Sequence, residues 1–293
     1  MTPLAQKIRS GTFVVTTELN PPKGIDLTEL YAKADLLKGH VDAFNLTESP
    51  RARMAIDPRS VARLLIDRGV EPIVQVTARD RNRIAIQADL LGAAALGIGN
   101  FVFMGGDSPK HGDHPEAKPV FDINTSDLLR AARSLSQGRD LAGNELKGTP
   151  SFFLGATVNP AAANFIDETE NARRKIDAGA EFLQTQALYD PAVLERFLEA
   201  VKPDGVAVLA GIIPLKSIKM ATWLNANVPG IRVPKALLAE MQSVAGTDRE
   251  VATGVQMAQR IVASVRKLSA GVHLMALGWE SHIPEILRGS GVR

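Results

Sequence analysis

The chain has 293 residues and no cysteine. This absence excludes disulfides, iron–sulfur clusters, thiolate zinc sites and cysteine nucleophiles. The sequence also lacks any run of about 18 consecutive apolar residues, so we expect no transmembrane helix. Residues 1–11 carry charges and contain no apolar segment ahead of a cleavage site, so we expect no secretory signal.

A large excess of one charge is missing as well. Thirty-four Lys and Arg residues face 32 Asp and Glu residues, which leaves a formal net charge of +2. So small an excess gives no electrostatic footprint for nucleic acid. With 45% hydrophobic and 23% charged residues, the composition is typical of a globular chain rather than a disordered or fibrous one. We therefore expect a cytoplasmic enzyme that binds neither nucleic acid nor membrane.

What the chain does contain is a regular alternation of short β-branched runs and amphipathic stretches. The predicted strands are Thr12–Glu18, Val41–Leu46, Glu71–Thr77, Asn100–Met104, Phe152–Thr157, Phe182–Thr185, Gly205–Leu209 and Gly271–Met275. Eight strands in a chain of this length give about 36 residues per unit, close to the repeat of a (β/α)₈ barrel. An open doubly wound sheet would need a glycine-rich turn after the first strand, where this chain has Leu19-Asn20-Pro21-Pro22. The pattern therefore favours a TIM barrel.

The helical stretches lie between these strands. They include Asp26–Lys38, Asp57–Arg68, Arg81–Leu96, Thr125–Ser136, Thr169–Ala178 and Ala192–Val201. Asp26 and Asp57 are predicted N-caps, and Gly39 and Gly69 are predicted C-terminal stops. Residues 234–268 are too many for one crossover and are predicted to hold two helices. We thus expect one α/β domain over residues 1–293, with an inserted helical segment at about 234–268.

Chemistry in a (β/α)₈ barrel is performed at the C-terminal ends of the strands. Polar residues stand at or just beyond these ends throughout the chain. They are Glu18, Asn20, Asn45, Thr47, Gln75, Thr77, Asp107, Thr157, Asn159, Gln184, Gln186, Lys216 and His273. Any one of them is equally well explained as a rim residue. Together they predict a site, but they do not specify a reaction.

Two clusters of charge are harder to interpret. Residues 107–116 include Asp107, Asp113 and Glu116 with two histidines, but their spacing fits no standard metal-ligand pattern, and we predict no metal. We interpret His111 and His114 as solvated loop residues. The run from 79 to 83 holds three arginines, which we interpret as a solvated helix start; the alternative is that it faces an anion.

One predicted helix carries a distinctive polar face. Glu168, Asn171, Arg174 and Lys175 share a face by the i, i+3, i+4 rule. A solvated surface would explain this arrangement. The alternative is a face that holds the ribose and diphosphate of a cofactor, with the two cations neutralising phosphate and the amide bonding a hydroxyl.

Six motifs in order carry a family resemblance that covers about residues 8–288. They are Thr17–Gly24 (TELNPPKG), Met104–Pro109 (MGGDSP), Asn171–Ala180 (NARRKIDAGA), Gln184–Gln186 (QTQ), Ala210–Pro214 (AGIIP) and Gly271–Ala276 (GVHLMA). In this order they resemble the methylenetetrahydrofolate reductases. The resemblance implies a (β/α)₈ barrel that holds FAD and reduces 5,10-methylenetetrahydrofolate to 5-methyltetrahydrofolate, in the short bacterial form with the catalytic domain only. It also implies NADH, NADPH or a partner protein as electron donor, and a place in one-carbon metabolism and methionine biosynthesis.

The resemblance also assigns roles to residues. Glu18 matches the general acid, Asp107 the carboxylate beside flavin and folate, and Gln186 the glutamine that binds the pterin; His273 is expected to contact substrate. The expected FAD-binding residues are Thr47, Gln75, Thr77, Gly106, Asp107, Asn159, Glu168, Asn171, Arg174 and Lys175.

Three positions depart from the pattern of the best-known members. Leu19-Asn20 stands in place of two phenylalanines, Gly105 in place of an arginine, and Ala187-Leu188 in place of aromatic residues. We therefore expect the contacts with folate or nicotinamide to differ from those of the best-known members. We also expect a homo-oligomer that acts on a small molecule. The alternative function is a folate-binding methyl-transfer barrel, or an electron-accepting subunit of a larger complex. Such a protein would use Asp107 and Gln186 but not the 168–175 face.

Overall fold

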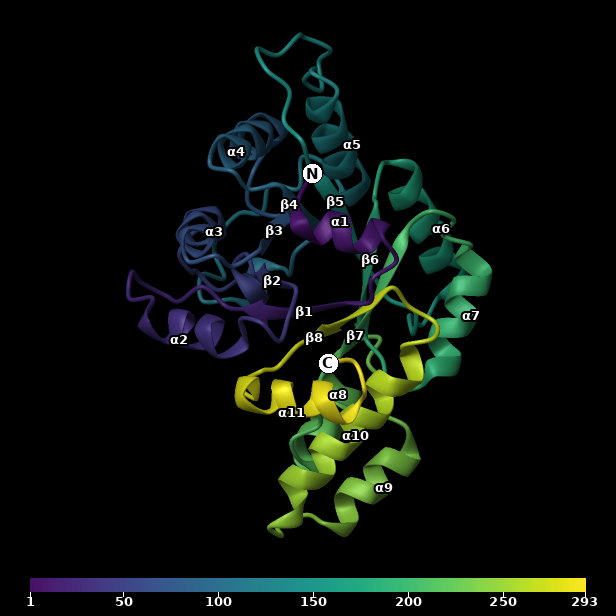
Figure 1. Ribbon diagram of the computed structural model, residues 1–293. Coiled ribbons are helices and arrows are strands. Elements are labelled where there is room, and N and C mark those ends of the chain that lie inside the picture. The colour runs from purple at the N-terminus through teal and green to yellow at the C-terminus, as the bar shows by residue number, and fades with distance from the viewer.

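The computed structural model describes all 293 residues and contains one closed barrel of eight parallel strands (Figure 1). The strands are β1 (Val14–Leu19), β2 (Ala43–Leu46), β3 (Pro72–Thr77), β4 (Asn100–Met104), β5 (Phe153–Val158), β6 (Phe182–Ala187), β7 (Ala207–Ile212) and β8 (Gly271–Leu274). Each strand pairs with the next in sequence, and β1 closes the ring against β8. The predicted (β/α)₈ TIM barrel is confirmed.

Helices surround the barrel on its outside (Figure 1). They are α1 (Pro3–Arg9), α2 (Thr28–Leu37), α3 (Pro58–Asp67), α4 (Arg83–Ala95), α5 (Thr125–Ser136), α6 (Phe165–Asp177), α7 (Pro191–Val201), α8 (Ile218–Asn227), α9 (Lys235–Ser243), α10 (Arg249–Val265) and α11 (Ile283–Gly289), with short 3₁₀ turns η1 (Pro50–Ala52), η2 (Pro109–His111) and η3 (Glu280–His282). The segment at 234–268 contains α9 and α10. Helices α1, α8 and α11 were not among the stretches named from the sequence. No helix combines the length and apolar character that crossing a membrane requires.

The strands are buried on both faces because helices cover the outside and side chains fill the inside. One small apolar cluster fills the N-terminal end of the barrel and includes Leu4 of α1. Phe153 and Phe182 stack there with ring centroids 4.9 Å apart. Gly155 makes this packing possible, since a Cβ atom at that position would lie 2.3 Å from the Phe182 ring. Helix α1 and these rings seal one end, so ligands have access only from the other.

Three of the four predicted helix caps and stops are confirmed, and one is wrong. Asp57 caps α3 by accepting a hydrogen bond from the Ser60 amide at 3.0 Å. Gly39 and Gly69 adopt left-handed φ values of 88° and 70° just past α2 and α3, as predicted stops should. The prediction for Asp26 is wrong. Its carboxylate accepts from the Thr28 amide in a local turn one residue too early, so Leu27 becomes the N-cap.

Candidate active site

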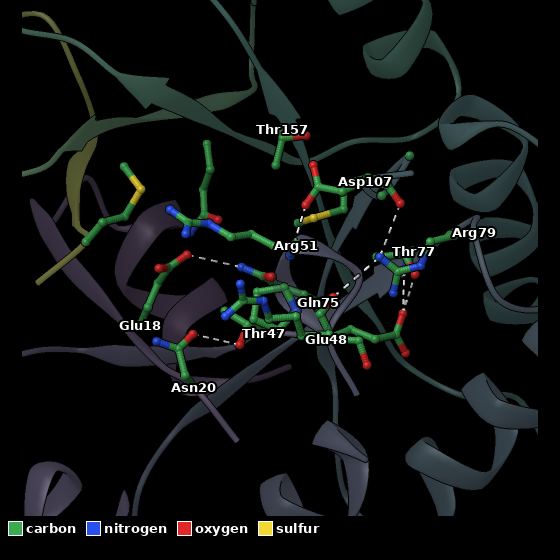
Figure 2. Close-up of a pocket in the computed structure, with 18 of the residues that line it drawn as sticks. Glu18, Asn20, Thr47, Glu48, Arg51, Gln75, Thr77, Arg79, Asp107 and Thr157 are labelled. Atoms are coloured by element: carbon green, nitrogen blue, oxygen red, sulfur yellow. Dashed lines mark hydrogen bonds between the residues drawn. The ribbon is translucent and has the colours of Figure 1, made fainter. Parts of the chain in front are cut away.

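A cleft of about 1270 Å³ opens at the C-terminal end of the barrel (Figure 2). Every strand except β2 and β7 contributes to its lining, as do the loops after β1, β2 and β4. Most of the residues singled out from the sequence meet in this one cleft: Glu18, Thr47, Gln75, Thr77, Gly106, Asp107, Asn159, Glu168, Lys175, Gln186 and His273. Asn171 and Arg174 do not line it and border a second cavity described below.

Glu18 enters the cleft at the end of β1 and is held only by long contacts (Figure 2). Its Oε1 atom lies 3.5 Å from Nε2 of His273 and 3.4 Å from the Nε2 donor of Gln75. The other ring nitrogen of His273 lies 2.9 Å from the Thr16 hydroxyl, directly opposite it in the β1–β8 register. The carboxylate is therefore oriented from two sides and still available to a ligand.

A buried polar layer lies beneath Glu18 inside the barrel. Asn45 and Gln184 exchange two hydrogen bonds, of 2.7 and 3.2 Å, and Gln184 also reaches the Thr16 hydroxyl at 3.5 Å. All three side chains are buried. Sequence analysis placed Asn45 and Gln184 at strand ends but could not show that they bind each other. Because their polar atoms are largely satisfied, they support the orientation of His273.

Asp107 follows β4 on a loop that requires glycine. Gly106 has a φ of 91°, and a Cβ atom there would lie 3.1 Å from Cβ of both Thr77 and Arg79. The Asp107 Oδ2 atom accepts a hydrogen bond from the Arg51 amide at 3.0 Å, whereas Oδ1 has no partner in the chain. A Cβ atom on Gly105 would meet no atom within 4 Å, so this departure leaves open space in the cleft.

The interpretation of the 79–83 run as a solvated helix start is wrong for Arg79. This side chain is buried and forms a bidentate pair with Asp80 at 2.6 and 2.7 Å. Its remaining Nη1 donor points toward the backbone carbonyls of Ser49 and Asp107, at 3.4 and 3.5 Å (Figure 2). The hydrogen bonds with Asp80 raise the pKa of the guanidinium. Arg79 thus supports the two loops that flank Asp107.

Glu48 is a cleft residue that the sequence analysis did not single out. It is buried, and its Oε2 atom accepts hydrogen bonds from the backbone amide and hydroxyl of Thr77, at 2.6 and 2.8 Å. Its Oε1 atom accepts from Arg81 at 2.5 Å, so Arg81 faces an anion rather than solvent. The available signal was an acidic residue directly after Thr47 at a strand end. Its role depends on Arg81, for which both a solvated position and one facing an anion were open from the sequence.

The polar face of α6 is partly buried against the cleft. Lys175 is buried and donates to the Thr157 carbonyl at 2.7 Å; burial lowers the pKa of its ammonium, against the attraction of Glu168. Glu168 accepts from the Asn159 amide at 2.7 Å and from the Asn171 side chain at 3.0 Å. The solvated alternative is therefore wrong for Lys175, although Arg174 on the same helix is mostly exposed.

A second cavity of about 420 Å³ adjoins this face, and Lys175 lines both cavities. All its lining residues are polar: Asn124, Thr125, Ser126, Arg130, Asn171, Arg174 and Lys175. They combine the N-terminus of α5 with the cationic end of the α6 face, an arrangement that suits phosphate oxygens.

Gln186 stands at an irregularity of β6, where the pairing with β7 shifts between Gln184 and Ala187. Its Oε1 atom accepts a hydrogen bond from the Ala187 amide at 2.9 Å. The Nε2 group has no acceptor in the chain and lines the cleft. Bulges commonly re-aim a side chain beside a site, and here the result is a free amide donor.

The family model described as methylenetetrahydrofolate reductase matches residues 3–291. The chain belongs to this family. It is 23% identical over 242 residues to a probable methylenetetrahydrofolate reductase (NADPH) of Caenorhabditis elegans. This alignment covers 80% of this chain and 34% of that protein. It is 25% identical over 232 residues to the 5,10-methylenetetrahydrofolate reductase of Pectobacterium carotovorum, covering 75% and 71%. The chain spans about a third to a half of the length of several eukaryotic relatives.

The fold is also similar to solved structures. One is an uncharacterized protein from Clostridium thermocellum that binds two copies of 5-methyl-5,6,7,8-tetrahydrofolic acid. The TM-score is 0.65 at 17% identity, and the match covers 99% of each chain. At this identity the likeness shows the fold alone.

The departures from the family pattern affect the cleft unequally. Leu19 and Leu188 are buried in the apolar core. Asn20 instead lines the cleft and accepts a hydrogen bond from the Thr47 hydroxyl at 2.9 Å. The expected rebuilding of ligand contacts is therefore concentrated at Asn20 and at the open space beside Gly105.

Proposed function

We propose that this chain reduces 5,10-methylenetetrahydrofolate to 5-methyltetrahydrofolate with electrons from NADH or NADPH that pass through bound FAD. The observation that carries the proposal is Glu18, a loosely held carboxylate in a large cleft that joins a phosphate-suited cavity at Lys175. Relatives named for NADPH in Caenorhabditis elegans and for NADH in Oryza sativa support a nicotinamide donor. A cytoplasmic location, a homo-oligomeric state and a role in methionine biosynthesis stay predictions.

Residues of the two cavities supply partners of the kind that FAD requires. Lys175 and Arg174 would neutralise the diphosphate, and Asn171 and Glu168 would offer hydrogen-bonding groups to ribose hydroxyls. The flavin ring would take the cleft lined by Thr47, Gln75, Thr77 and Gly106. A bound FAD would supply hydride transfer between the nicotinamide and the folate, chemistry that no side chain supplies.

Glu18 is proposed as the general acid. The imidazolidine ring of the substrate opens to an electrophilic iminium only if the departing nitrogen receives a proton. Glu18 carries this proton, while His273 and Gln75 hold the carboxyl group from two sides. The long contacts of 3.4 and 3.5 Å leave it free to tighten onto a ligand, as catalytic hydrogen bonds often do.

Asp107 and Gln186 are proposed to bind the pterin. The free Oδ1 atom of Asp107 accepts a hydrogen bond from a pterin N–H group, and the free amide donor of Gln186 binds a pterin acceptor. The charge of Asp107 also stabilises the positive iminium that develops when the ring opens. Binding and electrostatic stabilisation thus come from the same carboxylate.

A folate-binding methyl-transfer barrel, or a subunit that receives electrons from a partner, is the competing function. The folate-binding neighbour from Clostridium thermocellum is compatible with it. The absorption spectrum of the purified protein separates the two, and anaerobic reduction by NADH or NADPH followed by reoxidation with methylenetetrahydrofolate completes the test. A colourless protein that fails to take up added FAD would contradict our proposal.

A further inference from the structure

Five basic residues line the cleft, and they differ in what they bind. Three are engaged within the chain. Lys23 pairs with Asp113 at 2.5 Å, Arg79 with Asp80, and Lys175 with a backbone carbonyl. The other two are Arg51 and Arg53, which have no carboxylate within 4.0 Å and are exposed at the cleft. Both belong to residues 49–54, which we call the strap.

The strap has an unusual backbone. Ser49, Arg51 and Ala52 adopt left-handed φ values of 42°, 57° and 54°, although none is glycine. Such conformations persist only where the surroundings enforce them, and they gather at active sites and ligand clamps. The cost of this backbone makes the strap a candidate for function.

Contacts from the β4 loop enforce the shape of the strap. Asp113 accepts a hydrogen bond from the Met54 amide at 3.0 Å, and the ion pair with Lys23 lowers the pKa of Asp113 to about 2. Gly112 lies against the Ala52 carbonyl, since a Cβ atom there would approach it to 2.0 Å. The Arg51 amide binds Asp107. The strap is therefore a fixed wall that presents its arginines in defined positions.

The Arg51 guanidinium also contacts an aromatic ring. It lies over the ring of Trp223 on α8, 5.6 Å from the centroid. An aromatic face attracts the cation and leaves the in-plane N–H donors available for an anion. Arg51 thus has a preferred location while its hydrogen-bonding groups stay unoccupied.

The cleft changes character from its depth to its rim. His273 of β8 lies at the depth beside Glu18, and Met275 and the half-exposed Leu277 follow along the same chain segment. The two strap arginines follow β2, line the same cleft and are exposed. A ligand with a polar ring system, an apolar middle and an anionic end complements this order.

We propose that Arg51 and Arg53 bind the carboxylates of the glutamate tail of the folate substrate. This inference rests on the proposed function, because it takes the ring of that substrate to lie beside Glu18. Dinucleotide phosphates offer similar anion chemistry, but the phosphate-suited cavity lies at α5 and α6. Those helices flank β5, three strands from β2 in the ring, so the two anion sites lie on different sides of the cleft.

The test compares two ligands that differ only in the tail. Equilibrium binding of 5-methyltetrahydrofolate and of 5-methyltetrahydropteroate, which lacks the glutamate, is measured by calorimetry. We expect the unaltered protein to prefer the folate by at least about tenfold, the effect of one hydrogen bond between charged groups. The double variant Arg51→Ala with Arg53→Ala should lose this preference and leave pteroate binding unchanged, and the matching lysine variant should keep part of it.

Arg232→Ala with Arg249→Ala is the matched control, because both arginines are exposed, lack a carboxylate within 4.0 Å and lie outside the cleft lining. It should retain the full preference. Equal binding of both ligands by the unaltered protein would overturn the proposal. Equal weakening of both in the strap variant, or a raised KM for NADH with folate binding unchanged, would overturn it too. A protein that shows the tail preference but reduces no folate would contradict the reductase function and still support the subsite.

Discussion

Carboxylates at the two ends of the barrel are held in different ways. At the N-terminal end, Asp42 accepts hydrogen bonds from Lys7 at 2.6 Å and from the Val15 amide at 2.7 Å, and it also pairs with Arg293. At the C-terminal end, Glu18 has only contacts of 3.4 and 3.5 Å. The first carboxylate ties both chain ends to β1, whereas the second remains available.

The same contrast extends to neighbouring groups. Near the sealed end, the Asn100 side chain uses both its oxygen and its nitrogen, which bind Thr2 and Glu71. At the cleft, the Gln186 amide nitrogen and one Asp107 oxygen have no partner in the chain. Gln186 is half-buried and Asp107 is exposed, so both open groups are accessible from the cleft. The satisfied groups at the sealed end support the fold, and the open groups are where we expect a ligand to bind.

The largest expected effect is at Glu18. Glu18→Gln keeps the shape but removes the acidic proton, so the folate half-reaction should slow by about 10²–10⁴-fold or more. Reduction of the flavin by nicotinamide needs no such proton and should be largely unchanged. Both half-reactions are measured by anaerobic stopped flow together with a melting temperature. Equal slowing of the two, or an unaltered folate rate, would place Glu18 among the supporting residues.

A comparable effect is expected at the phosphate-suited cavity. Arg174→Ala with Lys175→Ala removes two charge-assisted contacts of roughly 1.5–3 kcal/mol each, and FAD should be lost. Flavin absorbance after dialysis measures the occupancy. Arg173→Ala is a suitable control. This exposed arginine lies on the same helix but donates a hydrogen bond to the Ala200 carbonyl and does not line the cavity. Full occupancy in the double variant would show that this face only supports α6.

Asp42 tests the sealed end. Asp42→Ala leaves the Val15 amide unpaired and frees two partly exposed cations, so we expect a loss of about 1–3 kcal/mol in the free energy of unfolding. Activity and folate binding should be unchanged per folded molecule. Urea unfolding and steady-state kinetics measure the two properties. A variant with normal stability but impaired catalysis would contradict the assignment of Asp42 to stability alone.

The bounds predicted from the sequence match the structure for helix α5 and strand β4. The predicted bounds place β7 too early, because Gly205 belongs to a left-handed turn and the strand continues to Ile212. The continuation needs Gly211, where a Cβ atom would lie 2.2 Å from the Thr185 carbonyl. Such close approaches follow from neighbouring strands and cannot be seen in one segment.

The strand-end rule and the family motifs located most of the cleft. They could not identify Glu48, the burial of Arg79, or the strap, because these depend on loops that meet only in three dimensions. The Arg51 amide, for instance, binds a carboxylate 56 residues away. Contacts of this kind involve ordinary residue types and leave no local pattern in the sequence.

The smallest expected effects concern pH and compare the two ends directly. Burial raises the pKa of Glu71 at the sealed end above 4.5, against hydrogen bonds from Asn100 and the Leu4 amide. The native state therefore binds more protons than the unfolded state just above that pH, and the free energy of unfolding falls as pH rises through this window. At the rim, the hydrogen bond with Lys23 lowers the pKa of Asp113 from 3.8 to about 2. There the native state binds fewer protons, so its stabilisation is present above pH 3.8 and is lost as pH falls toward 2.

Two neutral variants should therefore change the pH dependence of stability in opposite directions. Glu71→Gln removes a carboxyl group that opposes folding once it ionises, so its stability relative to the unaltered protein should improve as pH rises above 4.5. Asp113→Asn removes a stabilising carboxylate, so it should be less stable above pH 3.8, and the difference should shrink on acidification. Urea unfolding from pH 3 to 7 provides both curves. If the two variants shift stability in the same direction, the pKa values of Glu71 and Asp113 are not displaced in opposite directions.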